Sequence, residues 1–480
     1  MRGFAGRTVV WAVTSANHQT TKRNPVAFDR REAAIERFSV AEGVRSLVVG
    51  VVDTPPTDEF AEVTVKAIEA GTDDLVRLSP ENTVVACSTP EVSKLYEQLG
   101  YQVIGVEPEG TARPWDVLLM IADGNDAWKQ LAHPATVDVF ERYALDAHVA
   151  RCVNDPVVGD DGGLTTTRDY KTYADAFETA ADRKWQQIKD FVRPGRILDI
   201  GCATGATLQL VDRDPRFHES DLIGVEVARH LYAECVHKKE QGLFSNPNVY
   251  FYQRNMLGSA SQKEGWSPPR SIDTTLTLAL THEIWSYADG SRPATVQRFA
   301  DALFAHTAPH GVWINSDVCG PDEPDRPVVL RLDDSDGANP DDVAELEALD
   351  DPAAYVGKLS TRARFFQFAH DFRRNAKVPY SYVVSGDGIQ LRLADAMDFL
   401  TRKDYVDNWL SETHEQFCGL NFAGWTAVAE RAGFTIDPSS HAWRNDWVIT
   451  NRIAPVASIT TPNGTPVDWP TTHQLLIARR

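Results

Sequence analysis

The sequence predicts an α/β protein with two parallel-sheet domains, and three observations support this prediction. The chain has 480 residues, more than a single core usually holds before it divides into domains. Apolar residues make up 42% of the chain and charged residues 24%, both close to the globular average. Short apolar runs alternate with helix-length segments in two separate stretches, as expected for strands joined by crossover helices.

The first stretch of alternating elements occupies residues 7–143. Each predicted strand is followed by a segment of helical character, so consecutive strands are expected to run parallel. We place the first domain at residues 1–150. The predicted strands lie at 8–13, 44–52, 83–87 and 101–106, and the predicted helices at 29–38, 58–70 and 90–99.

A linker is predicted at residues 151–168, where Asn-Asp-Pro and Gly-Asp-Asp-Gly-Gly cluster turn-forming residues without a hydrophobic period. The second domain is predicted at 169–480, with a helix at 173–191 before its first strand at 196–200. A segment at about 321–420 begins rich in Asp, Pro and Gly and continues with aromatic helices. We expect this segment to be a helical, aromatic cap inserted in the second domain.

Charge limits the partners that are expected, and cysteine spacing limits the metal and disulfide sites. The formal net charge is −20, from 68 acidic and 48 basic residues, which disfavours nucleic acid and anionic membranes as partners. The absence of an apolar run of membrane length and of a signal peptide predicts a cytoplasmic protein. Six cysteines occur without a CxxC or CxxH pair, so no metal site and no disulfide framework is expected. The Asp-rich run at 332–337 is interpreted as a solvated loop, with a cation site as the alternative.

A glycine-rich turn follows the predicted strand at 196–200. Gly201 and Gly205 allow the backbone to pass close to a ligand, and the helix that follows offers N–H groups at its start. Glu226 ends the next predicted strand, about twenty residues on, where nucleotide-binding folds place a carboxylate on ribose hydroxyls. The dinucleotide fingerprint Gly-x-Gly-x-x-Gly is absent from this turn.

The run Asp199-x-Gly201-x-x-x-Gly205 resembles motif I of the class I S-adenosylmethionine-dependent methyltransferases, which have a Rossmann-like fold. The resemblance covers about residues 170–320 by motif and the rest of the chain more loosely. It implies methyl transfer from S-adenosylmethionine to a small-molecule acceptor, with Asp199 near the methionine end of the cofactor and Glu226 on the ribose. The cofactor-binding residues it implies are Asp199, Gly201, Cys202, Ala203, Gly205, Glu226, Asn255 and Met256, the last two beside the adenine.

The acceptor is expected beyond the predicted strand at 272–280, because open α/β sheets bind ligands at the carboxyl ends of their strands. His282 and Glu283 follow this strand and are predicted as catalytic residues. A neutral imidazole beside a carboxylate can act as a general base. The alternative is that His282 caps a helix or packs in the core, since displacement at a sulfonium can proceed by positioning alone. Farther along the chain, His414-Glu415 is the next candidate pair.

The first domain resembles the archaeal-type nicotinamide mononucleotide adenylyltransferases over about residues 8–143. The resemblance rests on Asn24-Pro25-Val-Ala-Phe28 and on Gly110-Thr111-Ala112-Arg113. It implies a nucleotide-binding site. The residues it implies for that site are His18, Lys22, Asn24 and Arg113.

This first domain departs from the family at its catalytic motif. A His-x-Gly-His run, whose imidazoles stabilise the transferred phosphoryl group, is missing, and Ser15-Ala16-Asn17-His18 does not replace it. We therefore expect a degenerate domain that binds a nucleotide or serves as a scaffold. Two alternatives remain: a bifunctional nucleotidyltransferase and methyltransferase acting on a nucleotide-activated substrate, and a non-catalytic protein that binds adenosylmethionine.

Overall fold

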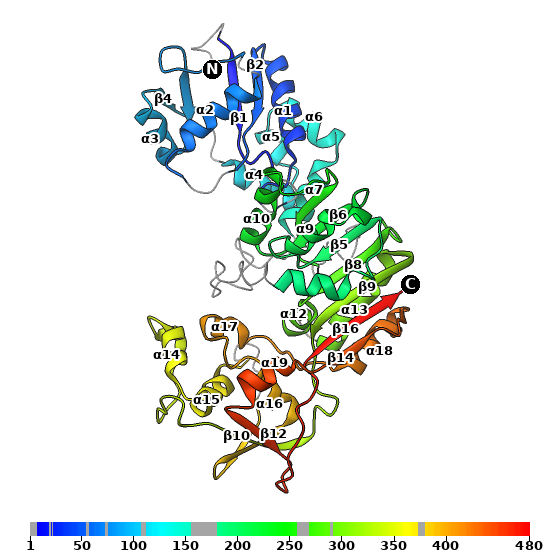
Figure 1. Cartoon of the computed structure of the whole chain (residues 1–480). Helices are drawn as coiled ribbons and strands as arrows, with labels where there is room; N and C mark the ends of the chain where they lie inside the picture. Colours follow the sequence, from blue (N-terminus) through cyan, green and yellow to red (C-terminus); the bar gives the residue numbers. More distant parts are fainter. Residues whose placement is uncertain are drawn as a thin grey trace. The chain divides into compact units, whose positions relative to one another are not determined.

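The computed structural model confirms the α/β fold class and divides the chain into two compact units (Figure 1). The first unit is Met1–Pro156 with Tyr252–Arg254, and the second is Val157–Phe251 with Asn255–Arg480. Lys22 and most of the predicted linker lie outside the described residues. The structure describes residues 7–18, 21, 23–53, 57–72, 75–106, 112–154, 180–256, 268–288, 291–372 and 380–480.

The first unit contains the parallel crossovers that the alternating pattern predicts. β1 pairs in parallel with β2 and β3 with β4, and each pair is joined by a helix. Within the described part of this unit the four strands form two separate two-stranded sheets. The elements are β1 (Val9–Val13), α1 (Phe28–Ala41), β2 (Ser46–Gly50), α2 (Phe60–Gly71), β3 (Val84–Cys87), α3 (Pro90–Gln98), β4 (Gln102–Gly105), α4 (Pro114–Ala122), α5 (Trp128–Leu131), α6 (Pro134–Arg142) and α7 (Leu145–Val153).

The second unit is built around a central sheet in the order β13-β16-β9-β8-β5-β6-β7, with β14 also paired to β16. β5 pairs in parallel with both β6 and β8, and β8 with β9, whereas β16 is antiparallel to β9. From β5 the chain proceeds to β6 on one side and later to β8 on the other. The strands are β5 (Arg196–Ile200), β6 (Asp221–Glu226), β7 (Val249–Gln253), β8 (Ile272–Leu278), β9 (Thr307–Val318), β13 (Thr435–Ile436), β14 (His441–Trp443) and β16 (His473–Arg479).

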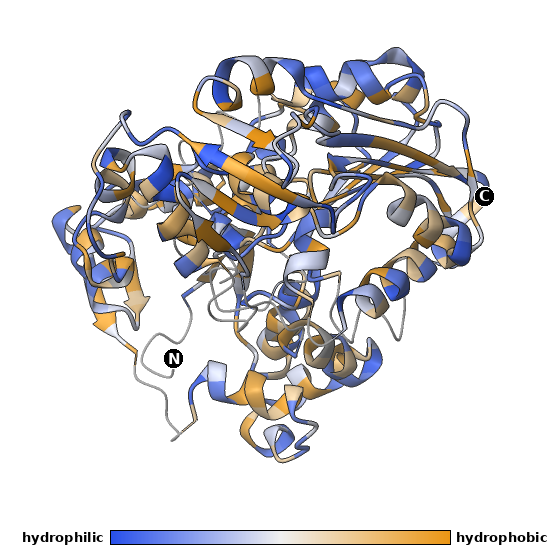
Figure 2. Ribbon diagram, turned by 90° about the horizontal axis from the view of Figure 1, so that it is seen from below, coloured by the Kyte–Doolittle hydropathy of each residue, from blue (hydrophilic) through white to orange (hydrophobic). Residues whose placement is uncertain are grey.

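Helices cover both faces of this sheet because its strands are apolar on both sides. On one face Ile197 packs in a cluster with α9 (Ala206–Arg213) and α10 (Arg229–Glu240). On the other face Leu198 packs with α13 (Arg292–His306) and α18 (Phe422–Ala432). Individual helices carry both hydrophobic and hydrophilic residues (Figure 2), as expected where one face of a helix packs on the sheet and the other faces solvent.

The segment at about 321–420, expected as a helical, aromatic cap, contains both helices and aromatic residues, and three of its strands form a second sheet with β15 from farther along the chain. Four strands in the order β11-β12-β10-β15 pair antiparallel. Phe365, Phe368, Phe399 and Trp409 are buried in its core. The elements are β10 (Pro327–Leu332), α14 (Pro352–Lys358), α15 (Thr361–Asp371), β11 (Val383–Ser385), β12 (Gly388–Arg392), α16 (Leu393–Leu400), α17 (Trp409–Glu412), α19 (Asp446–Val448) and β15 (Ala457–Thr460).

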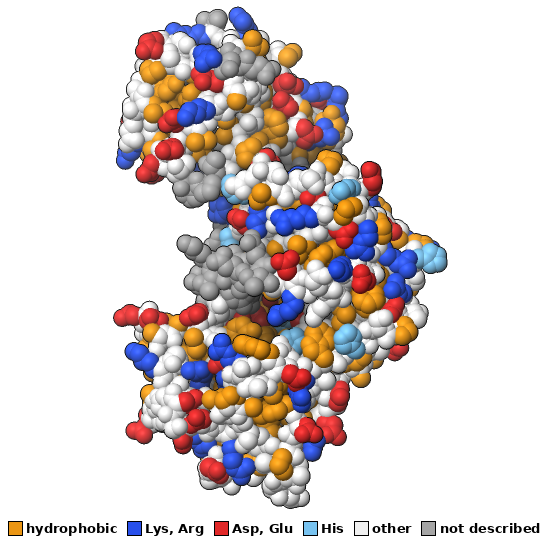
Figure 3. Space-filling model, viewed as in Figure 1, with side chains coloured by type: hydrophobic (Ala, Val, Ile, Leu, Met, Phe, Trp, Pro, Cys, Tyr) orange, Lys and Arg blue, Asp and Glu red, His pale blue; other side chains and the backbone are white. Residues whose placement is uncertain are grey.

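Two surface properties bear on partners. Acidic and basic side chains are interspersed over the visible face of the molecule (Figure 3). Over the part of the chain that the structure describes, none of the helices is both long and apolar enough to cross a bilayer.

Candidate active site

The turn after β5 has the backbone conformation that its glycines predict. Gly201 and Gly205 have φ angles of +70° and +74°, and Ala203 between them has +49°. A Cβ at Gly201 would lie 2.8 Å from the Leu280 side chain. A larger residue would therefore be strained both by this contact and by the positive φ angle. The Gly201 and Cys202 N–H groups donate to the Val225 carbonyl, at 2.8 and 3.1 Å. The turn is thus tied to the end of β6.

Glu226, the last residue of β6, faces this turn. Its carboxylate accepts the N–H groups of Ala203 at 2.9 Å and of Val227 and Ala228 at 2.8 Å each. The side chain is 7% exposed. Three backbone donors therefore hold the carboxylate in one orientation, between the ends of β5 and β6.

Asp199 on β5 is buried beside this turn. Burial raises the pKa of Asp199 to about 7, the nearby Lys184 ammonium lowers it in part, and the Glu226 carboxylate raises it further. Lys184 lies in the helical segment 180–188, and burial lowers its own pKa. A buried carboxyl group in this state is stabilised in its ionised form by any cation that binds next to it.

The remaining residues of the predicted cofactor set surround the same strand ends. Cys202 is buried within the core cluster, and its hydrogen bond with Cys235 together with burial raises the pKa of its thiol. Asn255 and Met256 follow β7 and are half-buried, and Met256 packs against the cluster that contains Leu198. The structure thus brings the turn and Glu226 into direct contact, with Cys202 turned into the core.

His282 lies in α12 (Thr281–Ser286), directly after β8, and is held by Asp317 of β9. Its Nδ1 lies 2.7 Å from Asp317 Oδ1, and its backbone N–H donates to Asp317 Oδ2 at 3.1 Å. The Thr281 hydroxyl donates to the same oxygen at 2.7 Å. Asp317 is buried, and these bonds fix the orientation of the imidazole.

The other ring nitrogen of His282 faces the loop that follows α17. His282 Nε2 lies 3.3 Å from Glu415 Oε2, and the Phe417 ring packs edge-on against the imidazole, with 4.9 Å between ring centroids. Trp285 Nε1 donates to Gln416 at 2.9 Å, so α12 and this loop contact each other at several points. Glu283, the second predicted catalytic residue, offers a carboxylate oxygen to the same cluster.

The charges in this cluster reinforce one another. Burial alone lowers the pKa of His282, but the Asp317 and Glu415 carboxylates outweigh it and hold this pKa well above its usual value. Burial raises the pKa of Asp317, yet the charge and hydrogen bonds of His282 leave it below its usual value. Because both ring nitrogens face carboxylates, a base role for His282 requires Nε2 to separate from Glu415.

Asp317 and Glu415 were not in the predicted catalytic set. Asp317 lies near the end of β9, which pairs with the strand before His282, and a charged residue at that place is the signal that could have identified it. Glu415 is a secondary candidate in the sequence, which has no pattern that brings it to α12.

In the first unit, the described residues that were predicted to bind a nucleotide each contact a different neighbour. His18 Nε2 is 3.5 Å from Asp53 Oδ2, and the Asn24 N–H donates to the Thr21 hydroxyl at 2.9 Å. Arg113 precedes α4, is exposed, and donates its N–H to Asp116 at 2.8 Å.

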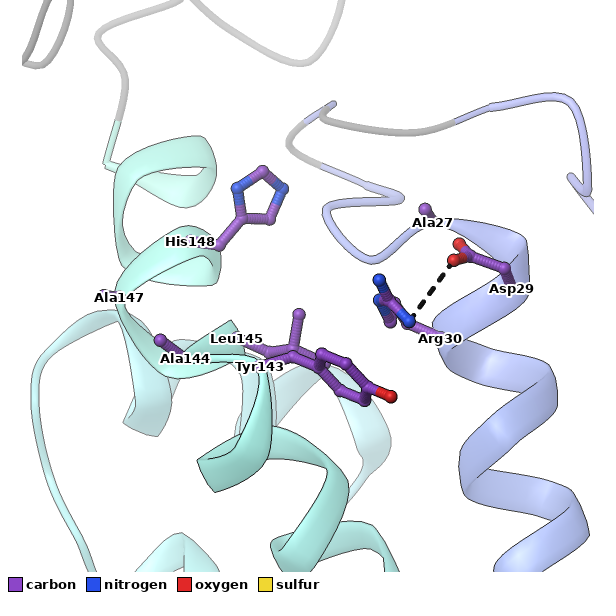
Figure 4. Close-up of a pocket in the computed structure, with 8 residues that line it drawn as sticks. All are labelled: Ala27, Asp29, Arg30, Tyr143, Ala144, Leu145, Ala147 and His148. Atoms are coloured by element: carbon purple, nitrogen blue, oxygen red, sulfur yellow. Dashed lines mark ion pairs between the residues drawn. The ribbon is translucent and has the colours of Figure 1, made fainter.

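A cavity of about 410 Å³ lies elsewhere in the first unit, between the starts of α1 and α7 (Figure 4). The Arg30 guanidinium lies over the Tyr143 ring, 3.8 Å from its centroid, and pairs with Asp29 at 3.6 Å. Of the predicted nucleotide-binding residues, the three that the structure describes, His18, Asn24 and Arg113, do not line this cavity.

Comparisons with known proteins concern the fold. No protein-family model and no curated protein matches the sequence. A methyltransferase structure from Mesorhizobium loti, described as S-adenosylmethionine-dependent, is 14% identical, with 62% of this chain and 97% of that chain covered at a TM-score of 0.31. One from Archaeoglobus fulgidus is 11% identical, with 65% and 100% covered at 0.33. The [4+2]-cyclase SpnF is 13% identical, with 63% and 80% covered at 0.31. These values are too low to assign an activity.

Proposed function

We propose that the second unit binds S-adenosylmethionine at the turn after β5 and transfers its methyl group to a small-molecule acceptor held by the His282 cluster. One observation carries the proposal. The turn follows β5, the cluster follows β8, and these are the neighbouring strands between which the order of the sheet reverses. Open α/β sheets bind their ligands at this reversal, outside the carboxyl ends of the strands.

The residues around the turn fit this cofactor. Glu226 is oriented by three backbone donors and is the carboxylate suited to the ribose hydroxyls. Asp199, whose pKa is about 7, is suited to the positively charged methionine part. Asn255 and Met256 after β7 would contact the adenine, as the motif resemblance implies.

The chain's contribution to the reaction would be binding and orientation. The bound cofactor supplies a methyl group on a positively charged sulfur, and transfer breaks the carbon–sulfur bond while a bond to the acceptor forms. The methyl carbon, the sulfur and the acceptor atom must lie in line, which favours rigid acceptor contacts. His282 is such a contact, since Asp317 fixes both its backbone and its ring.

For the first unit we propose nucleotide binding or a scaffolding role, without nucleotidyl transfer. The missing His-x-Gly-His run argues against nucleotidyl transfer. The exposed position of Arg113 leaves its side chain accessible to a nucleotide. Release of pyrophosphate from ATP that depends on nicotinamide mononucleotide would contradict this proposal.

The experiment for methyl transfer uses adenosylmethionine labelled in the methyl group. The full chain is incubated with pools of small metabolites, and products that carry the label are identified by mass spectrometry. We expect a labelled product with the wild-type chain and much less with Glu226→Ala. A folded wild-type chain that binds the cofactor but labels no acceptor in any pool would favour the alternative of a non-catalytic binding protein.

A further inference from the structure

We propose that His282, Glu283 and Glu415 bind a divalent first-row transition-metal or zinc ion, which in turn would bind the acceptor through oxygen. One ligand atom from each of these side chains lies within 4.8 Å of the other two. The proposal rests on methyl transfer for the role of the ion, but the ion site itself can be tested without any acceptor.

The imidazole of His282 is held in the way that metal-bound imidazoles are held. His282 Nδ1 is 2.7 Å from the buried Asp317 carboxylate, which also accepts the backbone N–H groups of His282 and Val318. A carboxylate on one ring nitrogen is the usual arrangement around a metal-bound histidine, where it fixes the ring and leaves the other nitrogen for the metal. In His282 this other nitrogen is Nε2, the atom that faces Glu415, and ion binding would release its proton to solvent.

The distance between two of the candidate ligand atoms also fits a shared ion. His282 Nε2 and Glu415 Oε2 are 3.3 Å apart. A charge-assisted hydrogen bond between such groups is usually about 2.7–2.9 Å long. Two ligands bound to one ion at about 2.0–2.1 Å, with an angle between 90° and the tetrahedral value, are about 2.9–3.4 Å apart. The observed separation fits two ligands of one ion.

The loop that carries Glu415 is held by buried hydrogen bonds. Arg402 is 1% exposed and donates to the backbone carbonyls of Glu412, at 2.7 Å, and of Glu415. Asp398 accepts from Arg402 at 2.9 Å and from the Phe417 N–H at 2.9 Å. The loop is thus held on both sides of Glu415, as a preformed ligand requires.

The donor set indicates the kind of ion. Imidazole nitrogen suits zinc and iron, and carboxylate oxygen suits manganese and magnesium, so one nitrogen with two carboxylates favours Mn²⁺, Fe²⁺ or Zn²⁺ over Ca²⁺. Three protein ligands leave at least one position for another ligand. An acceptor hydroxyl bound there would have a lowered pKa and would be held beside the turn after β5.

The test measures ion binding to the full chain after dialysis against a chelator. Mn²⁺ is titrated and followed by electron paramagnetic resonance and calorimetry, and we expect one ion per chain with coupling to an imidazole nitrogen. His282→Gln and Glu415→Gln should weaken binding by about 100-fold or more, and Asp317→Asn, which removes only the support of the ring, by about 10- to 100-fold. Glu412→Gln, a buried neighbour outside the cluster, serves as the control and should retain the affinity.

Two results would overturn the proposal. The first is a wild-type chain that binds no Mn²⁺, Co²⁺ or Zn²⁺ with defined stoichiometry. The second is binding without the nitrogen coupling, which can be recorded on the wild type even if a variant fails to fold. Adenosylmethionine affinity is measured on the same samples. Loss of ion binding with intact cofactor binding would refute the ion site alone, whereas a chain that binds no cofactor would refute the methyltransferase proposal.

Discussion

The ionisation of Asp199 predicts that cofactor affinity depends on pH, because the pKa of this carboxyl group lies in the range of ordinary binding experiments. Burial raises this pKa to about 7, and a bound cation favours the ionised form. Lowering the pH through 7 protonates the carboxylate, so adenosylmethionine affinity should fall roughly tenfold from pH 7.5 to pH 6. Calorimetric titrations of the wild type and of Asp199→Asn at both pH values measure the difference. An equal pH dependence in the two proteins would show that Asp199 does not face the charged part of the cofactor.

His282 tests the placement of the acceptor. His282→Ala should leave adenosylmethionine affinity within a few-fold of wild type, since the side chain contacts Asp317, Glu415 and Phe417 but none of the turn residues in the bonds described. Methyl transfer should slow by up to about 10²-fold, the loss expected when an acceptor is misplaced by about 1 Å. Equilibrium dialysis and initial rates on the identified acceptor measure both effects. A variant defective mainly in cofactor binding would place the acceptor site elsewhere.

At the scale of elements, the buried pair of Arg402 and Asp398 joins α16 to the loop after α17. Arg402→Leu should lower the free energy of unfolding by about 3–5 kcal/mol, because it leaves the fully buried Asp398 without its counter-charge. Arg331→Ala is the control, since its pair with Asp387 is exposed and should be worth at most about 1 kcal/mol. Urea unfolding measures both. Similar values for the two variants would remove the support for a rigidly held loop.

The local elements could be predicted from the sequence because their signals are local. The turn after β5 requires residues in the left-handed backbone region, and the glycines at 201 and 205 indicate this requirement in the sequence. The position of Glu226 follows from the length of one crossover. Both predictions depend on contacts within about twenty residues of one another in the chain.

The contacts that complete the acceptor site could not be predicted, since they join distant segments. Trp285 donates a hydrogen bond to Gln416, 131 residues later, and the Tyr287 hydroxyl donates one to Glu415, 128 residues later. Their pairing depends on the second sheet, whose strands are short and separated by helices. A periodic hydrophobic pattern identifies a single helix or strand and does not indicate which residues at such separations contact each other.

At the scale of the whole molecule, each unit has its own apolar core, which predicts separate responses to ligand. Adenosylmethionine at 100 times its dissociation constant should stabilise the second unit by about 2.7 kcal/mol and raise its melting midpoint by roughly 5 °C. The transition of the first unit should not move. Differential scanning calorimetry of the full chain follows both transitions, and a shift confined to the first unit would place the cofactor there.

The central claim is that the turn after β5 and Glu226 bind adenosylmethionine, and calorimetric titration of the cofactor tests it most directly. The wild type should bind one molecule per chain. Glu226→Ala should weaken binding about 10- to 150-fold, the effect of losing a charged acceptor worth roughly 1.5–3 kcal/mol. Glu240→Ala, at the exposed end of α10, should bind as the wild type does. Equal affinity in Glu226→Ala and wild type, with circular dichroism showing both folded, would contradict the account.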